Sequence, residues 1–365
     1  MSVSAPRVSI YPADYDRAAD AVERAFADHA PPVGGRTCLV KPNILGAVPP
    51  ERHVNTHPTV VAAAIAALER RGAARITVGD NSGMRAYGSN EHAARVAGIF
   101  EAAGGRYVNL GASPVETALE SDFVERLAFS REVLECDLLV SLPKMKTHVA
   151  TGITGAVKNT YGHLVGGEKT RLHREAVGPE NFARAVVDVY QVRPPDLVVM
   201  DAVVAMEGQG PSGGRSRNVG RILASTNAVA LDACMAAMMG IEPRSIPMLR
   251  IAEERGLGPA DLAAIDIDGP FEVVPKFRTC SVGMGFGTWI SRIATYVFMT
   301  QPTVRLKNCV ACGSCAQACP VEAVTMTDAG PAIDYAKCIS CFCCHEMCRY
   351  EAMDLSRRMR FLQRL

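Results

Sequence analysis

Eight cysteines near the C-terminal end constrain this chain more than any other feature. They form two runs with C-x2-C-x2-C-x3-C spacing, and a proline follows the first run. This spacing is typical of ligands to cubane iron–sulfur clusters, where the fourth cysteine of each run binds the other cluster. We therefore expect two 4Fe-4S clusters. The ligands of the first are Cys309, Cys312, Cys315 and Cys348, and those of the second are Cys338, Cys341, Cys344 and Cys319.

Two features of this segment need a separate interpretation. Zinc would require four thiolates at each tetrahedral site, and two triplet-plus-one runs fit that arrangement poorly. Cys343 lies inside the second run. We interpret it as a buried thiol beside the cluster, although a ligand register that uses it stays open. The segment resembles the two-cluster ferredoxins, an α+β module, and departs from them at Arg349, where the resemblance implies proline. A cation there would raise the reduction potential, because reduction adds negative charge.

Composition narrows the class of protein. The 365 residues carry 39 Lys and Arg against 38 Asp and Glu, which argues against a general nucleic-acid binder. The length allows a core of about 270 residues beside the cysteine module. The N-terminal residues lack an apolar signal region, and no apolar run is long enough for a transmembrane helix. The remaining cysteines suggest no disulfide framework, so we expect a cytoplasmic protein.

Strand and helix signals alternate along the first 270 residues. Apolar runs predict strands at 37–41, 75–79, 107–110, 137–142, 196–200 and 221–225. Helices are expected from Pro58 to about Arg71, with Thr56 as the N-cap, and at 90–103, 180–191 and 227–239. This alternation predicts an α/β core with a mostly parallel sheet.

Polar residues follow several of these strands. Ligands of open α/β sheets bind beyond the carboxyl ends of the strands, so such residues are candidates for a site. Any single one could equally be an ordinary wet loop residue. The candidates for substrate binding are Lys41, Asn43, Asp80, Ser82, Asn159, Asp201 and Glu207.

The densest polar stretch is a predicted loop from Ser141 to Arg174. It carries six Lys or Arg, three His and one Glu, interleaved with glycines that let the backbone approach a ligand. Such a loop suits a carboxylate, a phosphate or a developing enolate. The alternative is a solvated basic loop. The candidate catalytic residues are Lys144, Lys146, His148, Lys158 and His173.

Other cofactor signals are weak. Residues 208–213 fit G-x-G-x-x-G, but a proline lies inside the motif and a strand is expected next, so NAD binding is rejected. The chain has no ATP P-loop motif, and neither flavin nor nickel is indicated. The three histidines of the basic stretch match no known metal cage.

Four segments divide the chain. We expect an α/β core at 1–270, a linker at 271–302 with a docking helix at Met284–Met299, a two-cluster ferredoxin domain at 303–356, and a basic tail at 357–365. The docking helix would pack the ferredoxin domain onto the core.

Several motifs resemble the "domain of unknown function 362" family, whose members often carry a C-terminal ferredoxin module. The motifs are Lys41-Pro-Asn, Thr56-His-Pro, Gly79-Asp80, Pro143-Lys-Met-Lys-Thr-His148, Gly155-Ala-Val-Lys-Asn159, Asp201 with Glu207, and Leu231-Asp232. The loop at 152–158 and His173 are also distantly similar to the nickel-pincer lactate racemases. That likeness implies a two-lobed core with a cleft, and does not establish nickel.

Three function classes remain open. The first is an iron–sulfur oxidoreductase that passes low-potential electrons from two clusters to an organic anion, conjugated or aromatic, in a core cleft. The second is an electron-transfer partner protein with no substrate of its own, and the third an isomerase or racemase-like core. An external ferredoxin, flavodoxin or reductase would supply the electrons. The sequence leaves open whether the chain forms oligomers.

Overall fold

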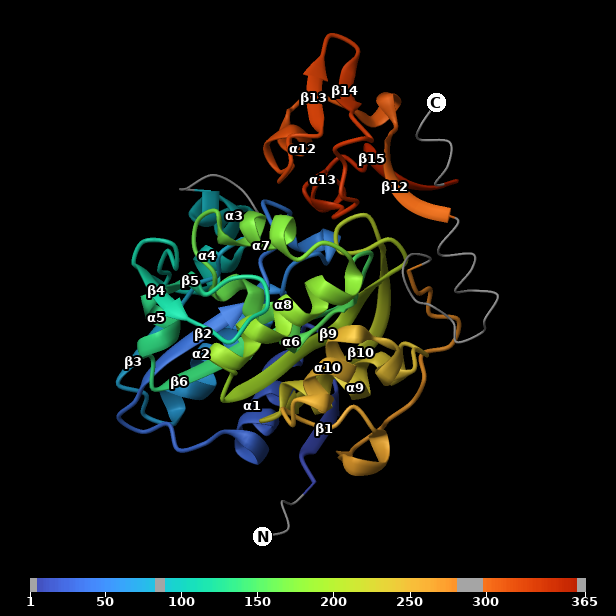
Figure 1. Cartoon of the computed structure of the whole chain (residues 1–365). Coiled ribbons are helices and arrows are strands. Elements are labelled where there is room, and N and C mark those ends of the chain that lie inside the picture. Colours follow the sequence, from blue (N-terminus) through green and yellow to red (C-terminus); the bar gives the residue numbers. More distant parts are fainter. Residues whose placement is uncertain (1–4, 83–88, 281–297, 360–365) are drawn as a thin grey trace.

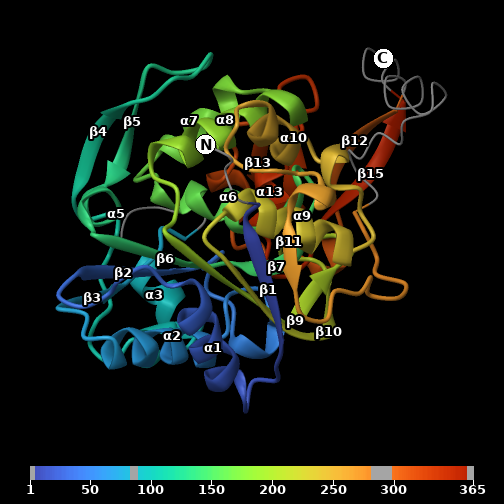
Figure 2. The same ribbon diagram turned by 90° about the horizontal axis from the view of Figure 1, so that it is seen from below.

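The computed structural model describes residues 5–82, 89–280 and 298–359. Its core is built on one sheet, with strand order β11-β1-β10-β9-β6-β2-β3, and β7 pairs with β9 on one side and with β8 on the other (Figures 1 and 2). The strands are β1 (Arg7–Pro12), β2 (Thr37–Pro42), β3 (Arg75–Val78), β6 (Leu138–Leu142), β7 (Lys144–His148), β8 (Gly152–Thr154), β9 (Leu197–Glu207), β10 (Arg215–Ser225) and β11 (Asp266–Asp268). Five of the eight pairings described in this sheet are parallel, which confirms the predicted mostly parallel α/β fold.

Helices cover both faces of the sheet because successive side chains of each strand point to opposite faces. In β9, Leu197 and Val199 belong to one apolar core, and Val198 and Met200 belong to the other. The first core is covered by α1 (Ala18–His29), α2 (Pro58–Arg70), α3 (Ser89–Val96) and α4 (Ile99–Ala102). The second is covered by α6 (Ala156–Asn159), α7 (Glu168–Glu175), α8 (Pro179–Val192), α9 (Ala228–Met238) and α10 (Pro247–Glu254). A hairpin of β4 (Pro114–Ala118) and β5 (Arg126–Ser130) lies outside the sheet, followed by α5 (Arg131–Glu135).

Three predicted elements differ from the structure. The helix at 90–103 is split in two at Gly98, whose φ of 69° interrupts the helical backbone. The strand at 107–110 is reduced to a single bridge between Tyr107 and Val78. The side chain of His57, not Thr56, caps α2 by accepting from the Thr59 N–H. Thr56 instead donates to the carbonyl of Leu142 at 2.6 Å.

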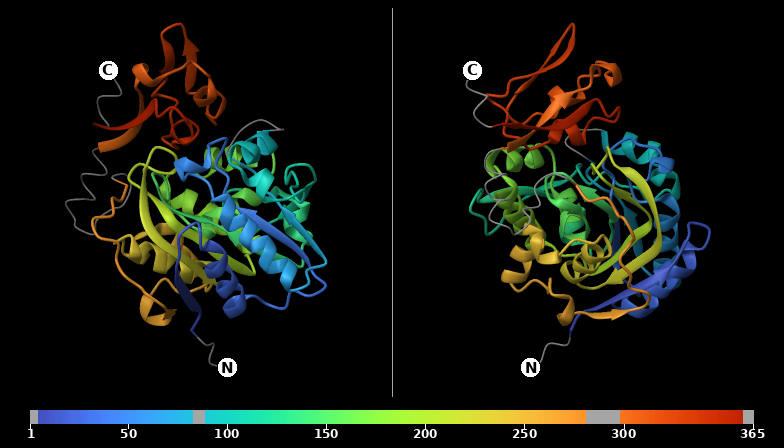
Figure 3. Two further views of the ribbon diagram at one scale, coloured as in Figure 1. Left: turned by 180° about the vertical axis from the view of Figure 1, so that it is seen from behind. Right: turned by 90° about the vertical axis from the view of Figure 1, so that its right-hand side faces the viewer.

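Residues 298–359 form a C-terminal module that stands on one end of the core (Figures 1 and 3). Its elements are β12 (Phe298–Val304), α12 (Ser314–Gln317), β13 (Val324–Thr327), β14 (Gly330–Ile333), α13 (Cys343–Glu346) and β15 (Met353–Met359). β12 pairs with β15, and β13 pairs with β14. In Figure 1, α13 faces the core and the β13–β14 hairpin points away from it. The expected docking helix at Met284–Met299 falls largely outside the described residues, and so does most of the tail.

The module repeats itself with an offset of 29 residues. The left-handed residues of the two halves correspond in pairs: Ala311 and Ser340 have φ of 53° and 54°, and Glu322 and Glu351 have φ of 53° and 54°. The backbone N–H of Ala323 donates to the sulfur of Cys319 at 3.1 Å, and the Ala352 N–H donates to Cys348 at 3.2 Å. The two cysteine runs therefore have equivalent backbone frames.

One position departs from this repeat. Gly313 has φ of 73° in the first half, whereas Phe342 has φ of 63° in the second. A bulky residue in this conformation costs about 1–2 kcal/mol. The Phe342 side chain is only 7% exposed and packs in an apolar cluster with Val149 of the core and Cys280. Packing against the core therefore accounts for the strained residue.

We expect Phe342→Gly to loosen the module from the core. The variant relieves the backbone strain, but it removes a buried ring worth about 3 kcal/mol. Limited proteolysis should release the module faster than from the original chain, with the iron content retained. Val310→Ala, at a position 55% exposed, is the matched control and should not change the release rate. An unchanged rate for Phe342→Gly would show that this ring does not hold the two parts together.

Candidate functional site

The predicted basic loop begins as a buried strand. After β6 ends, Pro143 lets the chain continue as β7 alongside β9, with Lys144 opposite Asp201 and Lys146 opposite Met206. β7 then turns into β8, where Lys146 faces Thr154 and His148 faces Gly152. All five residues of β7 are buried. The prediction of a loop here was wrong, because β9 continues and provides hydrogen-bonding partners for this segment.

β9 also corrects the prediction that Asp201 and Glu207 follow a strand. The strand continues to Glu207, so both carboxylates lie within it. Asp201 is fully buried and lies 2.7 Å from the Lys144 Nζ, which also donates to the Tyr15 hydroxyl at 2.8 Å. Glu207 accepts from the backbone N–H of Arg278 at 3.1 Å. Lys144 is thus held in a closed ion pair.

A pocket lies where the core meets the C-terminal module. Its empty volume, including the space that is open to solvent, is about 530 Å³. We call it the interdomain pocket. Its lining residues are Lys41, Asn43, Ile44, Leu45, Asp80, Asn81, Lys146, His148, Thr154, Lys158, Asn159, Tyr161, Gly162, Lys169, His173, Pro211 and Glu346. All of them belong to the core except Glu346, which comes from α13.

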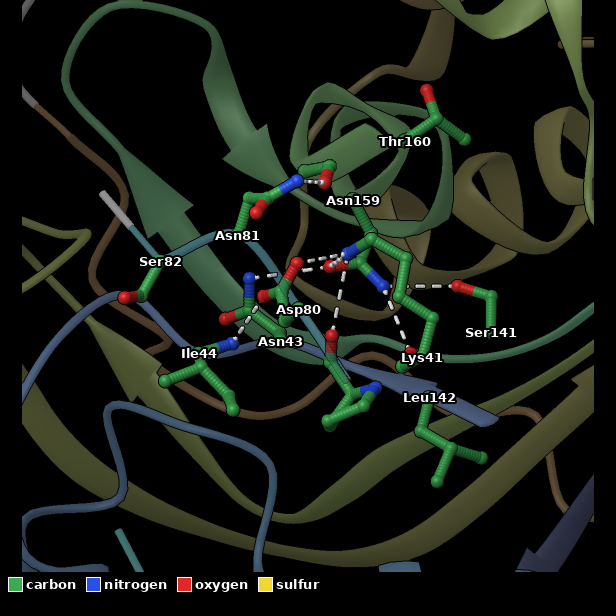
Figure 4. A network of polar contacts seen from close by, with 12 residues as sticks. Lys41, Asn43, Ile44, Asp80, Asn81, Ser82, Ser141, Leu142, Asn159 and Thr160 are labelled. Atoms are coloured by element: carbon green, nitrogen blue, oxygen red, sulfur yellow. Dashed lines mark hydrogen bonds and ion pairs between the residues drawn. The ribbon is translucent and has the colours of Figure 1, made fainter. Parts of the chain in front are cut away.

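One wall of the pocket is a buried polar network around Lys41 (Figure 4). Its Nζ lies 2.7 Å from Asp80 Oδ1 and donates to Asn159 Oδ1 at 3.2 Å. The second Asp80 oxygen accepts from the Ile44 N–H at 2.7 Å. Gly162 is required beside this pair, since a Cβ there would lie 2.2 Å from Asp80 Oδ1. This wall is charge-balanced and rigid.

The β7–β8 hairpin and α6 form a second wall, which we call the hairpin wall and which meets the first wall at Asn159, the last residue of α6. Asp232 accepts from the N–H groups of Ala156 and Val157 at 2.7 and 2.9 Å and so fixes the start of α6. Only glycine fits at residue 155, where a Cβ would lie 2.2 Å from that carboxylate. Burial raises the pKa of Asp232 to about 7, and the two N–H donors oppose the rise. This anchoring places Lys158 at the pocket.

All four lysines of the pocket have lowered pKa values, because burial penalises their charged form. The pKa of Lys146 is about 7, with the charge of Lys158 adding to the effect of burial. The pKa of Lys169 is about 8. Burial also lowers the pKa of Lys158, and Glu346 opposes that shift. Lys146 donates to the Val54 carbonyl at 3.0 Å, and Lys169 donates to the Asn81 carbonyl. The pKa values of Lys146 and Lys169 therefore lie near neutral pH.

Both histidines of the pocket have pKa values far below neutral pH, so their rings are uncharged. Burial and then Lys158 and Lys146 hold the pKa of His148 well below its usual range. Its Nδ1 accepts from the Ala150 N–H at 3.1 Å, so the proton of the neutral ring is on Nε2. Burial lowers the pKa of His173 to about 3, and its ring stacks on Phe182 with 4.1 Å between centroids. His148 can donate a hydrogen bond, but it is a poor acid.

Eight of the predicted catalytic and binding residues line the interdomain pocket. They are Lys41, Asn43, Asp80, Lys146, His148, Lys158, Asn159 and His173. Lys144, Asp201 and Glu207 lie outside the lining, and so does Ser82, which points away from the Lys41 network (Figure 4) and donates to Asn90 Oδ1 at 3.1 Å. Sequence reasoning missed Lys169, Tyr161, Thr154, Asn81 and Glu346. The spacing of Lys169, Leu172 and His173, which share the buried face of α7, could have revealed the first.

A second cavity connects this site to a cysteine. His173 lines the interdomain pocket and also a neighbouring cavity of about 350 Å³, whose wall includes Cys341 and Phe342. Glu346 lies between Cys344 and Cys348 in the sequence. The second cysteine run is therefore the one adjacent to the pocket.

The two cysteine runs lie close together, because Cys315 and Cys344 share one apolar cluster against which Cys319 and Cys348 pack. Burial raises the pKa of Cys315, and the thiols of Cys348 and Cys312 contribute further. Burial likewise raises the pKa of Cys338, with a contribution from Cys341 and Cys319. The fourth cysteine of each run thus lies near the other run. Within the described ranges, no three His, Cys, Asp or Glu side chains converge on a position for a single ion.

None of the helices in the described part of the chain has the length and hydropathy to cross a membrane.

Two parts of the chain match the models of known families. Residues 38–237 match the family described as "Domain of unknown function (DUF362)", and residues 302–325 match a "4Fe-4S binding domain". A thylakoid-associated protein of Synechocystis sp., sll1697, is 33% identical over 237 residues, which cover 62% of this chain and 70% of that protein.

Two solved structures are similar to part of this chain. One is a protein from Thermotoga maritima, with a TM-score of 0.42, 14% identity and coverage of 60% of this chain and 56% of that chain. The other is the lactate racemase apoprotein from Thermoanaerobacterium thermosaccharolyticum, with a TM-score of 0.45, 10% identity and coverage of 66% and 58%. The match spans less than two thirds of either solved chain.

Proposed function

The chain belongs to the DUF362 family and carries a 4Fe-4S binding domain, and we propose that it is an iron–sulfur reductase of an organic anion held in the interdomain pocket. The observation that carries this proposal is the shared wall. Glu346 of the C-terminal module closes a pocket whose other lining residues, four lysines among them, belong to the core. A site that needs both parts of the chain is expected when electrons pass from one to a substrate in the other.

The residues around the pocket have separable roles in this proposal. When bound, the clusters would supply electrons one at a time. Lys158 and Lys169 would hold the anion, and His148 would donate a hydrogen bond from Nε2. Lys146 is the better proton donor, because a pKa of about 7 is matched to neutral pH. The buried walls would keep water away from the reacting groups.

The proposal includes the environment and the partner. No disulfide bond joins any two of the thirteen cysteines, all of which the structure describes, and we propose a reducing, cytoplasmic location. An external protein would deliver electrons to the first cysteine run. Cys312 is exposed, whereas Cys344 of the second run is only 6% exposed.

Reoxidation of the reduced clusters by small anions tests the proposal. Anaerobic protein, reduced with dithionite and freed of excess reductant, should lose its reduced-cluster absorbance and electron paramagnetic resonance signal on addition of a conjugated carboxylate. The reduced product should appear in proportion. Stable reduced clusters in the presence of every bound anion would instead favour an electron-transfer partner with no substrate of its own.

We expect about eight iron atoms and eight acid-labile sulfides per chain prepared without oxygen, because eight ligands build two cubanes. Cys341→Ser should lower the iron content, and Cys343→Ser, which changes a thiol outside the ligand set, should not. Chemical analysis of iron and sulfide measures both. About four iron atoms, or stoichiometric zinc, would contradict the two-cluster assignment.

Anion binding should weaken as the pH rises. Lys146 and Lys169 are charged below their pKa values of about 7 and about 8 and lose their protons above them. Affinity for a carboxylate probe, which does not titrate in this range, should therefore fall by more than about tenfold between about pH 6 and about pH 9. Titration calorimetry across this range measures the fall. Lys146→Met should remove the step near pH 7, and an affinity that rises with pH would contradict this account.

A further inference from the structure

The charges that line the interdomain pocket are not balanced. Four ammonium groups belong to Lys41, Lys146, Lys158 and Lys169, and two carboxylates belong to Asp80 and Glu346. Asp80 forms its ion pair with Lys41 at 2.7 Å. When all six groups are charged, two positive charges are therefore left over. Buried charge without a counter-charge is costly in free energy, so the charged, empty pocket is unfavourable. A bound anion would supply the missing negative charge.

The hairpin wall also carries buried hydrogen-bond donors that have no acceptor in the described structure. Lys146 and Thr154 are direct partners across β7 and β8, and His148 lies two residues further along the same face. The Thr154 hydroxyl and the His148 Nε2 are buried without a hydrogen bond in the described structure. His148 Nε2 lies 3.2 Å from Glu346 Oε1, but the two atoms are not aligned for one.

Lys158 completes this group of donors. Its Nζ makes neither a hydrogen bond nor an ion pair with the residues that the structure describes, and it lies 5.5 Å from the ring centroid of Tyr161. An ammonium over an aromatic face keeps its charge available to a ligand. The hairpin wall thus offers Lys146, Thr154, His148 and Lys158 to the oxygens of an anion.

We propose that the ligand of the interdomain pocket is a compact dianion, with one acid oxygen group against the hairpin wall. Two negative charges match the two unbalanced positive charges. A dicarboxylate and a phosphate monoester both satisfy this requirement, because each carries two negative charges on its oxygen atoms. The inference deepens the proposed function and rests on it for the reaction, but not for binding.

Proton uptake gives a signature of dianion binding. In the empty pocket, burial and neighbouring lysines keep part of Lys146 and Lys169 unprotonated near pH 8. Two negative charges would favour the protonated forms, so binding should take up protons from the buffer. The heat of binding should then differ between Tris and HEPES, two buffers with different ionisation enthalpies.

Two matched pairs of probes test the charge requirement on the oxidised holoprotein. Fumarate and crotonate share a conjugated carbon chain but differ by one carboxylate, and phenyl phosphate and phenyl sulfate have the same shape but differ by one charge. The dianion of at least one pair should bind about tenfold or more tightly than its monoanion, with proton uptake. A preference in the first pair alone identifies a dicarboxylate site, and a preference in the second alone a phosphate monoester site.

Lys158→Met should reduce the preference for the dianion, whereas Lys276→Met, which changes an exposed lysine, should keep it. Equal affinities in both pairs, or no binding of any of the four probes, would overturn the inference. The proposed function fails separately. Dianions that bind tightly but never reoxidise the clusters would refute reduction and leave the dianion site intact. Reoxidation by crotonate as fast as by fumarate would refute the requirement for a dianion and leave reduction intact.

Discussion

Lys158→Met should reduce anion-dependent reoxidation of the clusters by about a hundredfold and leave the fold intact. Losing one preorganised donor costs about 3 kcal/mol in the transition state, which corresponds to about this factor. The Lys158 ammonium has no hydrogen-bond or ion-pair partner in the described part of the chain, so its removal leaves no carboxylate unpaired. Stopped-flow absorbance measures the rate, and the iron content and melting temperature should match those of the original chain.

Lys276→Met is the control for a change of net charge alone, since Lys276 is exposed and does not line the pocket. It should reoxidise at the original rate. If Lys158→Met lost iron or melted at a much lower temperature, Lys158 would be a structural residue. If it kept its rate, the hairpin wall would not be the binding site.

The same substitution at Lys144 should have the opposite consequences. Lys144→Met leaves Asp201 buried and without its cation, which costs about 3–5 kcal/mol of unfolding free energy. The Tyr15 hydroxyl also loses a donor at 2.8 Å. Chemical denaturation should show this loss. The residual folded protein should still bind anions, because Lys144 does not line the pocket.

A double variant isolates the cause of that instability. Replacing Asp201 with Asn in the Lys144→Met background removes the uncompensated charge at similar size and should recover part of the lost stability. If Lys144→Met cost less than about 1 kcal/mol, the ion pair would be accessible to water and comparable to a surface pair. The two substitutions would thus distinguish a structural cation, Lys144, from a functional cation, Lys158, within one short stretch of the chain.

The sequence could predict the site only as far as local spacing reaches. Cysteine spacing predicts the ligand sets, because cluster ligation depends on residues a few positions apart. Polar residues at the carboxyl ends of β2 and β3 were expected at one edge of the sheet, and Lys41, inside the end of β2, does form an ion pair with Asp80 there. Parallel strands bring such residues together wherever their carboxyl ends meet.

Longer-range geometry decided the rest. No local signal showed that β9 continues to Glu207, and only this extension pairs Asp201 with Lys144 instead of leaving both at a loop. Glu346 was missed because its contact with His148 joins residues almost two hundred positions apart. The carboxylate between two predicted cluster ligands was nevertheless visible in the sequence, close to Cys343, which was expected to be buried.

The repeat of 29 residues in the C-terminal module has a consequence for how substitutions accumulate. Corresponding residues of the two halves meet different demands: Gln317 is exposed, whereas its counterpart Glu346 is 8% exposed and closes the pocket. Gly313 and Ser314 likewise correspond to Phe342 and Cys343, both buried. We therefore expect the two halves, which share one backbone frame, to tolerate substitution unequally. The outer half can drift as long as its thiols stay in place, whereas the inner half changes only together with the core that it covers.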